Sequence, residues 1–186
     1  MRCETQLRDI GRGDKQAFNA LYSERNHGMV SYATGLLAGD SCAAEDVVNE
    51  AFFAIWAQAS RFNASGSAEG WIRRIVRNKA IDWVRKQRET SMTSTLESQI
   101  SNETADSSFD PFEVAAKSGA KVQLHRALVQ LSVEHREAIW LCYFEELPLS
   151  EIAEIAGCPE NTVKTRLFHA RKILAHLIVL NNTAVS

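Results

Sequence analysis

Residues 71–88, WIRRIVRNKAIDWVRKQR, carry side chains that are suited to binding nucleic acid. The stretch contains seven basic residues, one acidic residue and two tryptophans, although the whole chain has a formal net charge of −2. Basic side chains neutralise phosphates, and aromatic rings stack on unpaired bases for ~1–3 kcal/mol per base. The composition therefore favours contact with nucleic acid. Its alternatives are a basic face that is only solvated and an anionic membrane surface.

A second polar and basic surface is expected in residues 149–177, LSEIAEIAGCPENTVKTRLFHARKILAHL. Ser150 suits the N-cap of a short helix, Gly157 suits its end, and Pro159 suits the first turn of the next helix. The apolar residues around this turn have the spacing that a helix-turn-helix requires. They are Ile152, Ala153 and Ala156 before the turn and Val163, Leu167, Ala170, Leu174 and Leu177 after it. The alternative is a plain helical hairpin with a charged face.

The second helix of this motif would lie in a DNA major groove. Near its N-terminus, Asn161, Lys164 and Thr165 would reach base edges. Basic side chains would hold phosphates, which position the helix without specifying a sequence. These phosphate-binding residues are Arg166, Arg171 and Lys172.

The chain offers little for enzymatic chemistry. It has no Gly-rich phosphate loop, no HExxH motif, and no grouping of Cys, His and Asp with the spacing of a nucleophile. Its four cysteines show no paired CxxC spacing, so neither a zinc site nor a disulfide framework is predicted. We therefore expect no catalytic residue, no metal site and no cofactor.

Residues 42–60, CAAEDVVNEAFFAIWAQAS, are predicted to form the helix that presents a further surface. Apolar residues recur at steps of three and four along one side, which is typical of a core-facing helix. The expected core residues are Ala44, Val47, Val48, Ala51, Phe52, Ile55, Trp56 and Ala59. Phe53 lies on the opposite side, where a large ring beside carboxylates has little reason to face water. This side fits a protein-docking surface better than a solvated acidic face. Its members are Asp46, Asn49, Glu50 and Phe53.

The basic stretch itself is predicted to be an amphipathic helix after a loop, residues 61–70, RFNASGSAEG. Lys79 falls near the centre of the apolar side, so its amine must reach outward along the helix edge. The expected core residues are Ile72, Ile75, Val76, Ala80 and Trp83.

The chain is divided by a segment of different composition. Residues 89–120 hold one basic and six acidic residues, and eleven of the 32 are Ser or Thr. Such a segment buries too little apolar surface to offset its ordering entropy, which predicts a flexible linker. We expect an all-α protein with two small helical domains, residues 1–88 and 121–186, the second a helix-turn-helix domain.

Together these segments resemble the extracytoplasmic-function class of bacterial sigma factors, which are the promoter-recognition subunits of RNA polymerase. AEDVVNEAFFAIW is similar to the helix that docks on polymerase in that family. WIRRIVRNKAIDWVRKQR resembles the helix that melts and holds the minus-10 element. The segment from ALVQLSVEHREAIWL to EIAEIAGCPENTVKTRLFHARKIL resembles the domain that reads the minus-35 element.

The resemblance implies a role for each surface. The polymerase-binding residues would be Asp46, Asn49, Glu50 and Phe53. The loop and the basic helix would hold the minus-10 single strand through Asn63, Ser65, Ser67, Trp71, Arg74, Arg77, Asn78, Asp82 and Arg85. The minus-35 duplex would be read by Asn161, Thr162, Lys164, Thr165, Arg166, Phe168, His169, Arg171 and Lys172.

The implied partners are core RNA polymerase, promoter DNA as duplex and as melted single strand, and an anti-sigma factor. No membrane contact is expected, because no apolar run approaches the ~18 residues of a membrane span, and the expected location is the cytoplasm. The alternative function is a stand-alone helix-turn-helix regulator with a helical sensor or dimerisation domain. Such a domain would not need the basic stretch with two tryptophans at residues 71–88.

Overall fold

The computed structural model describes residues 2–63, 66–93 and 127–183, with the backbone alone described at residues 91–93 and 177–183. Within these ranges the regular secondary structure is helical and includes no strand, which confirms the all-α class. None of the helices in the described ranges is long and apolar enough to cross a membrane. Of the expected linker, residues 89–93 are helical, and residues 94–120 lie outside the described residues.

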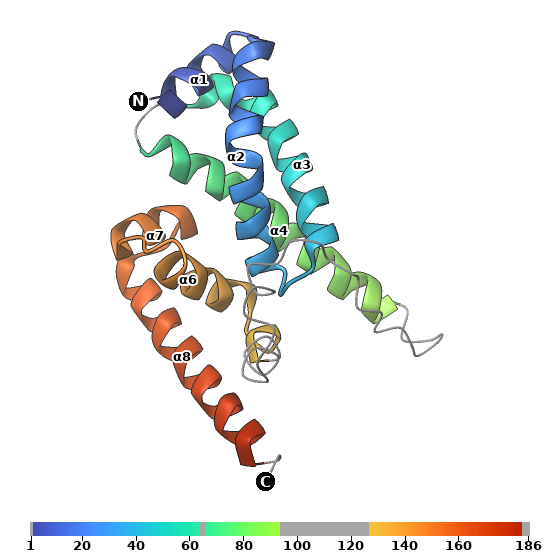
Figure 1. Cartoon of the computed structure of the whole chain (residues 1–186), viewed down its shortest axis with the longest axis vertical. Helices are drawn as coiled ribbons and strands as arrows, with labels where there is room; N and C mark the ends of the chain where they lie inside the picture. Colours follow the sequence, from blue (N-terminus) through green and yellow to red (C-terminus); the bar gives the residue numbers. More distant parts are fainter. Residues whose placement is uncertain (1, 64–65, 94–126, 184–186) are drawn as a thin grey trace. The chain divides into compact units, whose positions relative to one another are not determined.

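Contacts between Cα atoms divide the chain into two units, residues 1–33 with 40–108 and residues 34–39 with 109–186 (Figure 1). The elements of the first unit are α1 (Arg2–Gly11), most of α2 (Lys15–Leu36), α3 (Ser41–Gln58), the 3-10 turn η1 (Ala59–Arg61) and α4 (Ala68–Thr93). The elements of the second unit are α6 (Val133–Tyr143), α7 (Leu149–Ala156) and α8 (Glu160–Thr183).

The N-termini of α3 and α4, which carry the predicted sites of the first unit, are each capped by a side chain. The Asp40 carboxylate accepts a hydrogen bond from the backbone N–H of Ala43, at 2.9 Å, at the start of α3. The Ser67 hydroxyl accepts one from the backbone N–H of Gly70, at 3.3 Å, at the start of α4. A cap of this kind is worth ~1 kcal/mol, so both helices begin at defined residues.

The core of the first unit follows the predicted stripe of α3. Most of its expected core residues are buried, and Ala43 is buried as well. Trp56 is only half-buried, because its ring lies at the edge of the helix and packs against Phe18 from α2, with ring centroids 5.3 Å apart. The buried members of the stripe are Ala44, Val47, Val48, Ala51, Phe52, Ile55 and Ala59.

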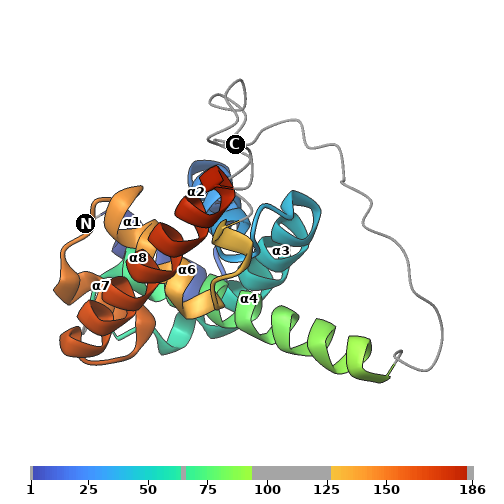
Figure 2. The same cartoon turned by 90° about the horizontal axis from the view of Figure 1, so that it is seen from below.

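The core face of α4 is narrower than predicted. Ile72, Val76 and Ala80 are buried, whereas Ile75 and Trp83 are half-buried. The C-terminal part of α4 extends past the helices that cover its first turns (Figures 1 and 2). Fewer neighbours therefore cover its side chains beyond Ala80.

The second unit contains the predicted helix-turn-helix. The turn lies at Gly157, which has φ 63° and ψ 37°, and the next helix begins directly after Pro159. The N–H groups of Gly157 and Cys158 donate to the carbonyls of Glu154 and Ala153 at 3.3 and 3.1 Å, which is the Schellman arrangement. The short turn between α7 and α8 is visible in Figure 2.

The prediction that Ser150 is the N-cap of α7 was wrong. Ser150 lies inside the helix, which begins at Leu149, and the cap residue is Pro148, without a side-chain cap bond. The Pro148 carbonyl accepts from the N–H of Ile152 at 3.1 Å, so the helix starts where the extended proline backbone leads into it.

The core of the second unit confirms the helix-turn-helix pattern as far as the side chains are described. The expected core residues Ile152 and Ala156 of α7 and Val163, Leu167 and Ala170 of α8 are buried. Ala153, also expected on this face, is half-buried, and Ile155 is buried without having been predicted. Leu174 is half-buried, and Leu177 lies outside the described side chains.

Replacing Gly157 with alanine is expected to lower the free energy of unfolding of the second unit by about 1 kcal/mol, because a Cβ disfavours the left-handed conformation. No steric clash adds to this cost, since a Cβ at this position meets nothing within 4 Å. The measurement is hydrogen exchange of the α7 and α8 amides in the full chain. Gly28→Ala is the matched control, because it has equal space but no positive φ. Unchanged protection in Gly157→Ala would contradict the prediction.

Candidate functional site

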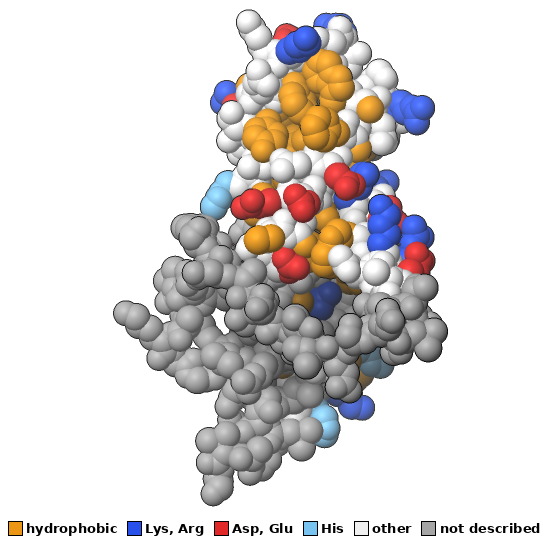
Figure 3. All heavy atoms as spheres, turned by 90° about the vertical axis from the view of Figure 1, so that its right-hand side faces the viewer, with side chains coloured by type: hydrophobic (Ala, Val, Ile, Leu, Met, Phe, Trp, Pro, Cys, Tyr) orange, Lys and Arg blue, Asp and Glu red, His pale blue; other side chains and the backbone are white. Residues whose placement is uncertain are grey.

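The outer side of α3 carries the four residues predicted to dock on polymerase, here called the α3 face: Asp46, Asn49, Glu50 and Phe53. All four are exposed, and the Phe53 side chain is 74% exposed. Figure 3 shows acidic side chains gathered on this side of the molecule, next to hydrophobic and basic ones. The α3 face therefore combines an open aromatic ring with carboxylates, as the sequence predicted.

An aromatic groove adjoins the α3 face. It is a cavity of about 380 Å³ lined by Phe18 and Tyr22 from α2 and by Asn49, Phe52 and Phe53 from α3. The Tyr22 ring packs edge-on against Phe52, with centroids 4.8 Å apart, and its hydroxyl lies 3.1 Å from the Asn49 side-chain oxygen. The α2 residues were missed, because the period of one helix does not reveal which residues of another helix lie beside it.

One ion pair joins the α3 face to α4. The Lys79 amine lies 3.1 Å from a carboxylate oxygen of Glu50. The lysine was expected to reach outward from the apolar side of its helix, and it does so toward α3. Asp46, in contrast, forms no hydrogen bond or ion pair with the described residues.

The loop before α4 carries three of the residues predicted to hold the minus-10 strand. Asn63 is exposed, Ser67 caps α4 through its hydroxyl, and Ser65 lies outside the described residues. The Trp71 ring packs on Phe62, with centroids 5.6 Å apart and planes tilted by 58°. Phe62 was not predicted as part of the site, because a single aromatic residue in a polar loop gives no periodic signal.

The exposed side of α4 is less uniformly cationic than its sequence. Arg74 and Asn78 are exposed, and the Arg77 guanidinium donates to the Asn78 side-chain oxygen at 3.3 Å. Arg85 pairs with Asp82 one turn earlier, at 3.1 Å. Part of the positive charge of this helix is therefore neutralised within the chain.

Replacing Asp82 with asparagine is expected to tighten binding of single-stranded DNA by up to about fivefold, because an exposed ion pair of this kind is worth ~0.2–1 kcal/mol and its loss frees Arg85. Fluorescence anisotropy of a labelled single strand at several salt concentrations measures the effect. Each additional phosphate contact should also steepen the salt dependence by ~0.7 in the log–log slope. An unchanged affinity and slope would mean that Arg85 does not meet the strand.

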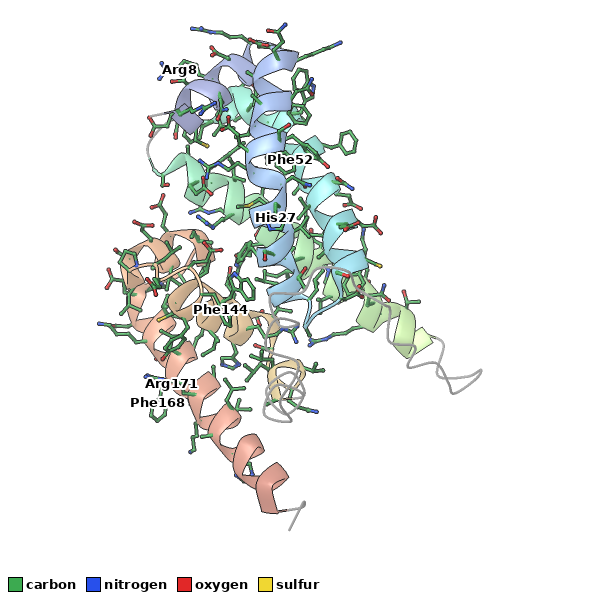
Figure 4. The ribbon with its side chains drawn as sticks, in the orientation of Figure 1. Arg8, His27, Phe52, Phe144, Phe168 and Arg171 are labelled. Carbon is green, nitrogen blue, oxygen red and sulfur yellow. The ribbon has the colours of Figure 1, made fainter. Side chains whose placement is uncertain are left out.

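The predicted reading helix, α8, presents its residues outward. Thr162 and Arg166 are half-buried, while the remaining predicted residues are exposed: Asn161, Lys164, Thr165, Phe168, His169, Arg171 and Lys172. The Phe168 side chain is 58% exposed, and Figure 4 shows it projecting from the same side of α8 as Arg171. The exposed surface is thus polar and basic around one aromatic ring.

Two of the exposed α8 side chains also bond to their own helix. The Thr165 hydroxyl donates to the Asn161 carbonyl at 2.9 Å, and the Arg171 Nε donates to the Leu167 carbonyl at 3.2 Å. These bonds restrain the orientation of the two side chains, which remain exposed.

A pair of imidazoles borders this surface. The rings of His135, in α6, and His169 have centroids 6.5 Å apart, and the Ser132 hydroxyl lies 3.2 Å from His135 Nδ1. Burial lowers the pKa of His135; Glu134 raises it, and His169 and Arg166 lower it further. His135 therefore adds little positive charge beside α8 at neutral pH. No group of three or more potential metal ligands occurs in the described part of the chain.

Two family models match the chain in the order of its two units. The model described as Sigma-70 region 2 matches residues 21–90, and the model described as Sigma-70, region 4 matches residues 121–174. The first match covers most of α2, α3 and α4 up to Thr90, and the second covers α6, α7 and the predicted reading residues of α8.

Known proteins are similar over most of the chain. It is 32% identical to the ECF RNA polymerase sigma factor SigL of Mycobacterium tuberculosis, over 83% of this chain and 85% of that protein. It is 28% identical to SigM of the same organism, over 94% of this chain and 83% of that protein. The solved structure of the sigma factor RpoE of Bartonella quintana, in complex with the anti-sigma factor NepR, superposes with a TM-score of 0.64 at 25% identity, covering 87% and 96% of the two chains.

The two matched regions stand in the same order as the predicted docking and DNA-binding surfaces, and the likeness to SigL extends over more than two thirds of each chain. The chain therefore belongs to the extracytoplasmic-function class of RNA polymerase sigma factors.

Proposed function

We propose that this chain is a promoter-specificity subunit that binds core RNA polymerase, recognises minus-35 and minus-10 elements, and promotes DNA melting. The proposal rests on one observation: the chain contains both sigma-factor regions. In each region a helix, α4 or α8, exposes basic side chains to solvent. The bond-forming chemistry of transcription belongs to polymerase, so the chain itself is not an enzyme. Its place of action would be the cytoplasm, where polymerase and promoters are found.

The α3 face is proposed as the polymerase contact. Phe53 and the aromatic groove beside it supply apolar surface, and Asp46 and Glu50 supply negative charge next to it. Exposed aromatic rings near the centre of an interface often carry much of its binding energy. The partner surface is expected to present an apolar side chain flanked by cations.

The loop before α4 and the exposed side of that helix are proposed to hold the minus-10 single strand. Trp71 lies beside the loop, and Arg74 and Asn78 follow it on the open side of α4. Extruding a base from the duplex costs a few kcal/mol, which stacking and phosphate contacts must offset. The full proposed set remains Asn63, Ser65, Ser67, Trp71, Arg74, Arg77, Asn78, Asp82 and Arg85.

The outer surface of α8 is proposed to read the minus-35 duplex. Asn161, Lys164 and Thr165 lie in its first turns, which is the part of a reading helix that approaches base edges. Phe168 extends the surface with a ring that can contact a thymine methyl group, and Arg171 and Lys172 can reach phosphates. Thr162, Arg166 and His169 complete the proposed set.

An anti-sigma factor is proposed as a regulatory partner. RpoE of Bartonella quintana, which is similar to this chain in fold and sequence, was solved in complex with the anti-sigma factor NepR. Such a partner would compete with polymerase or DNA for the exposed surfaces described above.

Run-off transcription on genomic fragments, with core polymerase and with or without the purified chain, tests the proposed function. New start sites that depend on the chain are expected, and their aligned upstream sequences would give both promoter elements. The alternative, a stand-alone helix-turn-helix regulator, predicts no new start sites but specific binding of duplex DNA. That combination of results would overturn the proposal.

A further inference from the structure

We infer that α1 positions the loop that would receive the minus-10 strand, and that it does so through Gly11. The inference rests on the proposed function, because it concerns the same strand-binding surface. It deepens that function by adding an element that the predicted site did not contain. The helix α1 also lies outside residues 21–90, which match the Sigma-70 region 2 model.

The last residue of α1 lies directly against the backbone of η1, which follows α3 (Figure 1). A Cβ placed on Gly11 would stand 3.0 Å from both the Cα and the backbone nitrogen of Ser60, and 3.2 Å from the carbonyl carbon of Ala59. Gly11 does not have a positive φ, so the close approach, and not an unusual backbone conformation, is what requires a glycine. A methyl group there would displace its neighbour by a few tenths of an ångström.

The anchoring of α1 makes η1 the partner that must move. Leu7 and Ile10 are buried, so α1 is packed into the core of the first unit. Near its other end, Arg2 and Gln6 both bond to the Glu24 carboxylate of α2, at 2.6 and 3.2 Å. In contrast, η1 is a turn of three residues, of which only the first is buried.

A shift of η1 reaches the proposed strand contact through Phe62. The N–H of Phe62 donates to the Ala59 carbonyl at 3.1 Å, which joins the start of the loop to η1. The Phe62 ring packs on Trp71, with centroids 5.6 Å apart. Because Trp71 is the aromatic member of the proposed minus-10 set, the contact between α1 and η1 affects where that ring lies.

The other end of the loop is held independently of α1. The Ser67 hydroxyl caps α4. One turn into that helix, the Glu69 carboxylate lies 3.1 Å from the guanidinium of Arg25 in α2 and 3.5 Å from that of Arg73. A displaced η1 therefore changes the shape of the loop and does not move the loop as a whole.

The expected effect is a loss of base contacts without a loss of phosphate contacts. Stacking a base on an aromatic ring tightens strand binding about five- to a hundredfold. A displaced Trp71 keeps part of that contact, so Gly11→Ala should weaken binding of a single strand about three- to tenfold. The exposed arginines of α4 lie beyond the displaced segment, so the salt dependence, which reports phosphate contacts, should not change.

Two labelled single strands of equal length separate these contacts in the full chain. One has a mixed sequence, and the other has the same backbone with abasic sugars at its central positions. Fluorescence anisotropy at low ionic strength should show that Gly11→Ala weakens binding of the mixed-sequence strand and leaves binding of the abasic strand unchanged. A loss of stability alone would weaken both. Gly28→Ala is the matched control, because it adds the same methyl group to α2 with nothing within 4 Å.

Two further variants test the path from Gly11 to the strand. Phe62→Ala leaves the contact between α1 and η1 in place, and it should cause the same selective loss. In a Trp71→Ala chain, adding Gly11→Ala should cause no further loss. Hydrogen exchange of the α3 amides checks that the first unit stays folded in each variant. If Gly11→Ala loses that protection, the strand binding of Phe62→Ala decides the outcome.

Four results would overturn the inference. They are an equal loss for both strands in Gly11→Ala, no loss in Gly11→Ala or in Phe62→Ala, a loss that persists in the Trp71→Ala chain, and wild-type binding that is equal for the two strands or absent. If the wild-type chain directs run-off transcription and one of these results is found, this inference fails alone. If run-off gives no new start sites, the proposed function fails, and the two strands still show whether α1 affects base contacts.

Discussion

Replacing Phe53 with alanine is expected to weaken binding to core polymerase at least tenfold while leaving the fold intact. The ring is 74% exposed, so its removal costs the free chain little packing. Covering such a ring at an interface contributes ~1.5–3 kcal/mol, and each 1.4 kcal/mol is about a tenfold change in affinity. The measurement is titration of labelled chain with core polymerase.

Phe168 provides a reciprocal control for this prediction, because it is a similarly exposed phenylalanine on α8. Phe168→Ala should weaken binding of promoter duplex but not of polymerase, and Phe53→Ala should do the opposite. Phe52→Ala is the structural contrast, since Phe52 is only 2% exposed and its truncation should destabilise the first unit by ~3–5 kcal/mol. Wild-type affinity of Phe53→Ala for polymerase would remove the α3 face from the docking surface.

The periodic features of this fold could be predicted from sequence. The core stripes of α3 and α8 follow from apolar residues at steps of three and four, and Gly157 ends α7 as its left-handed preference indicates. The exposure of Phe53 followed from the same period, because it lies opposite the core stripe. The spacing of apolar residues indicates which side of a helix is buried, whichever element packs against that side.

Contacts between helices could not be predicted in the same way. Tyr22 lies 27 positions before its partner Asn49, and Lys79 lies 29 positions after Glu50. Each pair depends on how two helices cross, which a one-dimensional pattern does not contain. The ring of Phe62 on Trp71 was missed for a related reason, since the path of a loop depends on backbone angles that its composition leaves open.

Local pairing also changes how the basic helix is understood. Sequence counting treats each arginine and lysine of residues 71–88 as available for phosphates. In the structure, Asp82 and Glu50 each neutralise one of these cations, Arg85 and Lys79. The charge that α4 offers to a strand is therefore set partly by acidic neighbours, and one of these, Glu50, lies on α3.

Replacing Val163 with aspartate is expected to unfold the helix-turn-helix and abolish duplex binding, by at least about a hundredfold. Val163 is 0% exposed and lies among buried residues of α7 and α8. A carboxylate there would be buried without a partner, and an uncompensated buried charge typically costs ~3–5 kcal/mol. A helical unit of this size has little stability to spare, because small domains bury a smaller fraction of their surface.

Hydrogen exchange separates this outcome from general unfolding. Protection of the α7 and α8 amides should be lost in Val163→Asp, while protection of the α3 amides and polymerase binding through the α3 face persist. Val163→Ala is the graded control: it removes only methyl groups and should leave the unit folded but less stable. Retained protection in α7 and α8 would show that the site tolerates a charge. Loss of protection in α3 as well would show that the two units unfold together, and that the docking helix depends on the reading domain for its stability.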